Sequence, residues 1–148
     1  MGVQISRQIE LAAQPEQIGE VLADLPRWPE WFALHKGWVD QVPARAEQGT
    51  KFKHRVRILG VPGEIEWKVT EVEFPTRFVL VGKGSNRTGA EIDFKVDPQQ
   101  QTSLVEFVAQ LKGLTLKPFE GMLKPWLEVR AERTVSALRT RVEGFDAR

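Results

Sequence analysis

Residues 114–145 read LTLKPFEGMLKPWLEVRAERTVSALRTRVEGF, and this stretch decides how the rest of the chain can fold. Beyond Pro125 it contains neither Gly nor Pro until Gly144, and it is rich in the helix formers Leu, Ala, Glu and Arg. It therefore predicts one long C-terminal helix with a bent or loose entry through Pro118, Gly121 and Pro125. At about 100° per residue, one face of this helix carries Phe119, Leu123, Trp126, Thr134, Ala137 and Leu138. Such a face needs an apolar surface to pack against.

The composition limits what that surface and its function can be. The 148 residues suit a single domain, 1–148, and the 41% hydrophobic and 28% charged contents are those of a folded globule. A net charge of +1 gives no reason to expect nucleic acid as a partner. The absence of cysteine excludes disulfides, cysteine-ligated zinc, iron–sulfur clusters and thiol catalysis. Without a signal peptide or a membrane-length apolar run, we expect a cytoplasmic protein with no integral membrane association.

The first forty residues predict a strand, two short helices and a second strand. Apolar and polar residues alternate over 3–11, which is typical of a strand with one buried face. Pro15 opens a helix that ends at Pro26, a second short helix is expected over 29–34, and a weak strand over 38–42. The aromatic side chains between them should close one end of the core: Trp28, Trp31 and Phe32.

The clearest local signal is a hairpin around residues 59–63. One face of its first strand is apolar (Phe52, His54, Val56, Ile58) and the other is basic, and the second strand alternates in the same way (Ile65, Trp67, Val69). We predict the register that pairs Val56 with Ile65, His54 with Trp67 and Phe52 with Val69, because it also pairs arginines with glutamates on the outer face. We expect that outer face to be solvated rather than to bind nucleic acid.

Three further strands are predicted, over 77–82, 90–96 and 105–111, and a bulge in the strand before them near 70–72. The element order is strand, two short helices, about six antiparallel strands and a long helix. The fold class is therefore α+β, with about seven antiparallel strands in all.

Three stretches resemble one family: QPEQIGEVLADLPRWPEW at 14–31, EFPTRFVL at 73–80 and ALRTRVEGF at 137–145. Together with the element order, they make the chain similar to the START-like (SRPBCC, Bet v 1-like) superfamily, in its polyketide cyclase/dehydrase and lipid transport branch. The resemblance implies a helix-grip fold, in which a curved antiparallel sheet wraps around the C-terminal helix and leaves a deep cavity. Members of the superfamily bind lipids, sterols, polyketides and hormones, and some are aromatase/cyclases or regulators.

Two polar residues on apolar faces are candidate ligand contacts. His54 could be an acid/base or hydrogen-bonding group that faces the cavity, or a core histidine bonded to a neighbour. Arg130 lies near the middle of the helix's apolar face, where it could meet a ligand oxygen or carboxylate, or extend to the cavity mouth. Both alternatives stay open for each residue.

Aromatic and thioether side chains could line the cavity around these two residues: Phe52, Trp67, Phe107, Phe119, Met122 and Trp126. The segments 118–125 and 83–88 carry chain-breaking residues and are candidate gates. No metal site, phosphate loop or nucleophile elbow is visible, so no cofactor is expected.

The sequence therefore favours the binding or transport of a small-to-medium hydrophobic ligand, such as a lipid, polyketide or isoprenoid-like molecule. One alternative is a polyketide aromatase/cyclase that uses His54 as its acid/base. Another is a regulatory protein-interaction module that docks a partner through Trp28, Trp31 and Trp38. A homodimer is compatible with all three.

Overall fold

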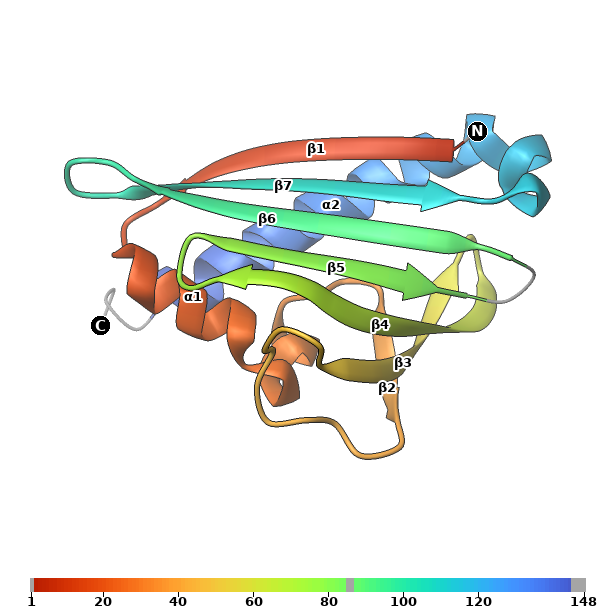
Figure 1. Cartoon of the computed structure of the whole chain (residues 1–148). Helices are drawn as coiled ribbons and strands as arrows, with labels where there is room; N and C mark the ends of the chain where they lie inside the picture. The colour runs from red at the N-terminus through yellow and green to blue at the C-terminus, as the bar shows by residue number, and fades with distance from the viewer. Residues whose placement is uncertain (1, 85–86, 145–148) are drawn as a thin grey trace.

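The computed structural model describes residues 2–84 and 87–144, which form one curled sheet around one long helix (Figure 1). Two of the helices are short 3₁₀ helices, labelled η. In chain order the elements are β1 Gly2–Leu11, α1 Pro15–Ala23, η1 Leu25–Glu30, β2 His35–Val39, β3 Lys51–Ile58, β4 Val61–Glu73, β5 Arg77–Lys83, β6 Gly89–Pro98, β7 Ser103–Lys112, η2 Leu114–Phe119 and α2 Glu120–Glu143.

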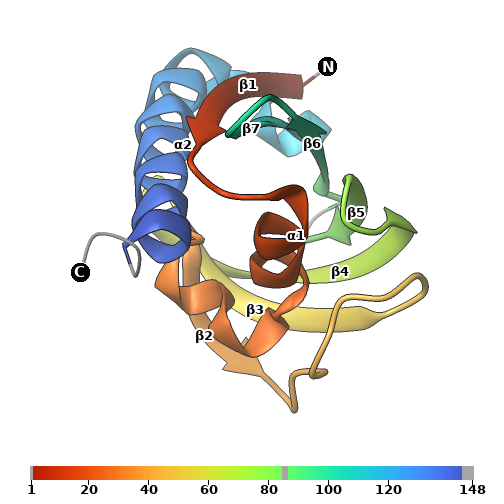
Figure 2. The ribbon, with the colours of Figure 1, turned by 90° about the vertical axis from the view of Figure 1, so that its left-hand side faces the viewer.

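Within the described residues, seven strands form a single sheet in the order β1-β7-β6-β5-β4-β3-β2, and all neighbours are antiparallel. β5 is central, as its apolar sequence predicts. The sheet curves so that α2 lies in its concave side, along β1 (Figure 2). This arrangement confirms the predicted α+β helix-grip fold, with two short helices after the first strand.

One end of the curled sheet is closed by α1 and η1, as Figure 2 shows. Pro15 is the first residue of α1, and the Gln17 side chain accepts a hydrogen bond from the backbone N–H of Gln14 at 2.9 Å. η1 starts at Leu25, earlier than the predicted 29–34, because proline is tolerated in a first helical turn and Pro26 lies in the first turn of η1. As predicted, Trp28 and Trp31 fill this end, each 1% exposed.

The β3–β4 hairpin has a different register from the predicted one. Leu59 and Gly60 both have positive φ (51° and 80°), which is the geometry of a two-residue hairpin turn. This turn pairs His54 with Ile65 and Phe52 with Trp67, so the predicted register was wrong by two residues. A shift of two preserves the faces, so the apolar side chains still point to the concave side. β2 also begins earlier than predicted, at His35.

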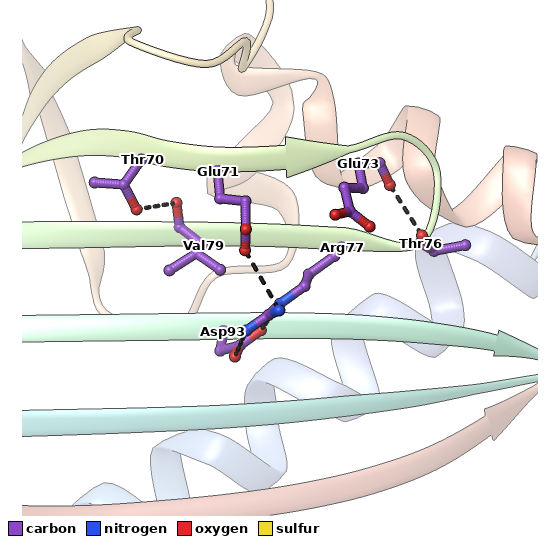
Figure 3. A network of polar contacts seen from close by, with 7 residues as sticks. All are labelled: Thr70, Glu71, Glu73, Thr76, Arg77, Val79 and Asp93. Atoms are coloured by element: carbon purple, nitrogen blue, oxygen red, sulfur yellow. Dashed lines mark hydrogen bonds and ion pairs between the residues drawn. The ribbon is translucent and has the colours of Figure 1, made fainter.

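On the convex face, polar contacts join neighbouring strands, and the ionic groups that make them lie away from the core (Figure 3). Arg77 on β5 contacts Glu71 on β4 at 3.4 Å and Asp93 on β6 at 3.0 Å. The register shifts between Val69 and Glu71, which confirms the predicted bulge, and Thr70 Oγ1 donates to the Val79 carbonyl at 3.3 Å. The buried residues of β5, which are Phe78, Leu80 and Gly82, lie on the opposite, concave face.

Helix α2 begins at Glu120, so Pro125 lies inside it rather than at its start. Its buried residues are Leu123, Leu127, Ala131, Thr134, Leu138 and Val142, a strip with spacings of three and four. The predicted face was therefore partly wrong: Trp126 and Ala137 are only half-buried, and Phe119 is exposed. No helix in the described chain is both long and apolar enough to cross a membrane.

Candidate functional site

A space of about 50 Å³ lies between the sheet and α2, and we call it the inner cavity. Strands β1, β4, β6 and β7 form its wall and α2 its cover. Its lining is Val3, Ile5, Phe32, Leu34, Ile65, Trp67, Ala90, Ile92, Phe107, Ala109, Gln110, Leu111, Leu127, Arg130, Ala131 and Thr134. Gln110, Arg130 and Thr134 carry polar groups, and the indole N–H of Trp67 is bonded to His54, so an occupant of this space would meet a mainly apolar surface.

A larger hollow of about 520 Å³, which we call the outer groove, opens at the end of the molecule opposite α1. The β3–β4 turn, residues next to the β5–β6 turn and the first residues of α2 surround it. Its lining is Val56, Ile58, Leu59, Val61, Pro62, Gly63, Glu64, Ile65, Gly84, Thr88, Phe119, Met122 and Leu123. Ile65 lines both spaces, so the groove and the inner cavity are neighbours.

Several apolar side chains of the outer groove are unusually exposed. Val61 is 66% exposed, Met122 60% and Phe119 48%. Scattered exposed apolar residues are ordinary, but several around one hollow mark a candidate binding site.

Arg130 is half-buried at the edge of the inner cavity. Its guanidinium carbon lies 4.3 Å from the centre of the Trp126 ring, which is a cation–π contact. Glu128 and Glu132, on the same helix, contact Arg7 of β1 instead. Within the described chain no carboxylate is within ion-pair distance of Arg130, and the contact found for its guanidinium is the face of the Trp126 ring.

His54 is fully buried and hydrogen-bonded at both ring nitrogens. Trp67 Nε1–H donates to His54 Nε2 at 2.9 Å, and the Nδ1 atoms of His54 and His35 are 3.0 Å apart. Because Nε2 accepts a hydrogen bond, the proton of the neutral ring is on Nδ1, which donates to His35. Burial, followed by the nearby His35, lowers the pKa of His54 to about 3. The ring is therefore neutral, and both of its hydrogen-bonding positions are occupied by protein.

The structure divides the predicted site residues among three places. Trp67, Phe107 and Arg130 line the inner cavity, and Phe119 and Met122 line the outer groove. Phe52, His54 and Trp126 line neither. Phe52 packs edge-on against Trp28, with ring centroids 5.3 Å apart, so it belongs to the core of the closed end.

Sequence reasoning missed the helix side of the inner cavity, Leu127 and Ala131. Counting turns from Glu120 would have placed these residues on the same face as Leu123, since the three are spaced by four. It also missed His35, which is half-buried beside His54. In the described part of the chain, no three His, Asp or Glu residues gather as a metal site would require.

A curled antiparallel sheet that grips a C-terminal helix over an apolar cavity defines the helix-grip class of ligand-binding domains. The chain belongs to the family described as polyketide cyclase/dehydrase and lipid transport, whose model matches residues 2–143.

Individual proteins are similar to this chain in sequence or in fold. The protein named Toxin Rv0910 from Mycobacterium tuberculosis is 30% identical over 119 residues, which are 80% of this chain and 83% of that protein. A START superfamily protein from Mycobacterium smegmatis has a TM-score of 0.74 at 21% identity, covering 96% of this chain and 98% of the other. Ara h 8.0201 has a TM-score of 0.70 at 10% identity, covering 97% and 99%. The two solved structures support the fold alone.

Proposed function

We propose that this protein binds a small-to-medium apolar molecule, which enters through the outer groove and extends into the inner cavity. The observation that carries the proposal is that two mainly apolar linings, one with exposed Met122 and one with buried Ile92, share Ile65. Covering this surface with ligand would remove apolar area from water, which contributes about 25 cal/mol per Å².

The volumes indicate how the ligand would sit. Typical small-molecule sites enclose roughly 300–1,000 Å³. The outer groove is of that size, whereas the inner cavity, at about 50 Å³, can accept only a small part of a ligand. Pro125 lacks an N–H and cannot donate to the carbonyl of Gly121, so the first turn of α2 is its least restrained part. We propose that this turn moves outward to admit more of the ligand.

Arg130 would orient the ligand. Its guanidinium has hydrogen-bond donors to spare at the cavity edge, and a ligand carbonyl or carboxylate is a suitable acceptor. Gln110 and Thr134 are further polar groups on the same lining.

The geometry of His54 favours binding over the aromatase/cyclase alternative. A cyclase needs an acid/base group within reach of the substrate, with a pKa near the working pH. His54 has both nitrogens bonded to Trp67 and His35, lies outside both cavity linings and has a pKa of about 3.

A pair of helix variants tests the proposal. Ala131→Leu would fill the inner cavity, whereas Ala137→Leu adds the same atoms to α2 at a half-buried position outside both linings. We expect a neutral apolar dye such as Nile red, and any ligand that native mass spectrometry finds in the purified protein, to bind the wild type and Ala137→Leu but not Ala131→Leu. Equal binding by the two variants would contradict the proposed site.

A second candidate, a growth-regulating protein, is favoured by the 30% identity to Toxin Rv0910. The tryptophans proposed to dock a partner are poorly available for it, since Trp28 and Trp31 are buried and Trp38 is half-buried. Induced expression in a mycobacterial host, with growth as the readout, tests this role, and unchanged growth would remove it. The cytoplasmic location and the homodimer stay predictions.

A further inference from the structure

The end of the molecule that carries the outer groove differs in charge from the rest. We call it the open end: residues 57–62, 83–84, 87–89 and 112–124, on the right of Figure 1. The whole chain has a net charge of only +1, yet this end carries six exposed basic residues: Arg57, Lys83, Arg87, Lys112, Lys117 and Lys124.

Each of these cations is next to a residue of the groove. Arg57, Lys83, Arg87 and Lys124 precede or follow lining residues directly, and Lys117 is two residues before Phe119. Lys112 pairs with Gly89 across the β6–β7 ladder, beside Thr88 of the lining. The cations therefore lie at the same end of the molecule as the exposed apolar residues. Strand alternation directs Arg57, Lys83 and Lys112 toward the convex side of that end.

Few carboxylates oppose these cations. Glu64 and Glu120 are the acidic residues of the open end and its lining, and Glu64 contacts Lys53 at 3.8 Å. None of the six cations forms an ion pair within residues 2–84 and 87–144. At the opposite end, by contrast, Arg27, Arg45 and Arg141 each contact a carboxylate.

We propose that the open end docks onto the surface of an anionic phospholipid bilayer. Lysine and arginine near such a surface are attracted by its negative potential, at about fivefold in affinity per residue. Val61, Phe119 and Met122 would enter the boundary between headgroups and acyl chains, which accepts apolar and sulfur-containing side chains. The contact is peripheral and does not require a molecule in the inner cavity, so it stands independently of the proposed ligand.

The mixture of aliphatic and basic side chains favours a bilayer over nucleic acid. Phosphate backbones would satisfy the cations, but single-stranded bases bind by stacking on aromatic rings. Two of the three exposed apolar residues, Val61 and Met122, offer no ring, and a duplex would leave them in water.

Vesicle sedimentation with the full chain tests the proposal. We expect the protein to pellet with vesicles that contain phosphatidylglycerol but not with vesicles of phosphatidylcholine alone. Raising the salt from ~0.1 M to ~1 M should release it, because the Debye length falls from about 10 to about 3 Å. No pelleting with anionic vesicles at low salt would overturn the proposal.

Matched variants locate the contact. Lys117→Gln with Lys124→Gln should weaken partitioning into anionic vesicles about 25-fold. Lys68→Gln with Lys95→Gln removes the same charge from the exposed convex face and should leave partitioning within about twofold. Met122→Gln, which changes no charge, should weaken it several-fold. The proposal fails if both lysine pairs act equally, if Met122→Gln has no effect, or if duplex DNA binds as tightly as anionic vesicles and is equally sensitive to the Lys117/Lys124 change. Circular dichroism confirms that each variant is folded.

Discussion

The two ends of the curled sheet differ in how far their aromatic and other apolar side chains are exposed to solvent. At the closed end, formed by residues 15–32, two tryptophan rings lie 5.0 Å apart and are almost fully buried. At the open end, Phe119 and Met122 are about half or more exposed. Apolar side chains are thus packed for stability at the closed end, whereas at the open end they are exposed and can contact a binding partner. Mutations at the two ends should therefore separate stability from binding.

The largest effect should come from Trp28→Ala at the closed end. Trp28 is 1% exposed, contacts Trp31, Phe32 and Phe52, and donates from Nε1 to the Leu22 carbonyl at 2.9 Å. Its truncation should lower the free energy of unfolding by about 3–5 kcal/mol, measured by urea denaturation. The matched open-end variant, Met122→Ala, should change stability by less than ~0.5 kcal/mol. Similar losses in both variants would abolish the distinction between the ends.

The next effect is a pH dependence of stability that comes from His54, on the sheet between the two ends. The pKa of His54 falls from 6.5 in the unfolded chain to about 3 in the fold, so the unfolded chain binds more protons between these values. The contribution of His54 to the free energy of unfolding is therefore fully present above about pH 6.5. It is lost as the pH falls toward 3, by at most ~1.4 kcal/mol per pH unit.

The variant His54→Gln isolates this contribution. Carboxylates also titrate in acid, but they are common to both proteins. Urea denaturation at pH 7, 6 and 5 should show the wild type losing about 1–2 kcal/mol more than His54→Gln over this interval. Parallel stability curves for the two proteins would mean that His54 is not held neutral in the fold.

A smaller effect of opposite sign should follow from Pro125→Ala at the open end. The substitution restores a backbone donor for the Gly121 carbonyl and should stabilise the protein by about 1 kcal/mol. This is below the ~3 kcal/mol for a proline in a helix interior, because the first turn can relax. Hydrogen exchange should slow at the amides of Trp126 and Leu127, while those of β5 stay unchanged. If the proposed opening is correct, Nile red should also associate more slowly.

Much of the fold could be predicted because the alternation of apolar and polar residues along a strand fixes its buried face even when the strand pairing is wrong. A register error of two residues leaves every side chain of the β3–β4 hairpin on its correct face, so the concave wall was right even though the pairing was not. The pairing itself depended on Leu59, a non-glycine residue with positive φ, and nothing in its identity predicts that conformation. Charge complementarity was satisfied in both registers and could not decide between them.

The site was less predictable because it depends on contacts between distant residues. Whether His54 faces a cavity or the core is decided by His35 and Trp67, which are 19 and 13 residues away. The error on α2 has a local cause: the predicted face was drawn through the large Phe119 and Trp126 side chains, whereas the buried strip runs through Leu127 and Ala131. The apolar pattern of a core and of a cavity lining is the same, so only the packed structure separates them.

A small loss of stability should come from an ion pair of the closed end. Arg45 contacts both carboxylate oxygens of Glu20, at 2.8 and 3.1 Å, and this hydrogen-bonded pair lowers the pKa of Glu20. Both side chains are largely exposed, so Arg45→Gln should cost only about 0.2–1 kcal/mol in urea denaturation. The variant also removes one positive charge, as Lys117→Gln does. If total charge governed attraction to anionic vesicles, the two single variants would weaken it equally. Because Arg45 is neutralised by Glu20 and lies at the far end, we expect Lys117→Gln to weaken vesicle binding and Arg45→Gln to leave it unchanged.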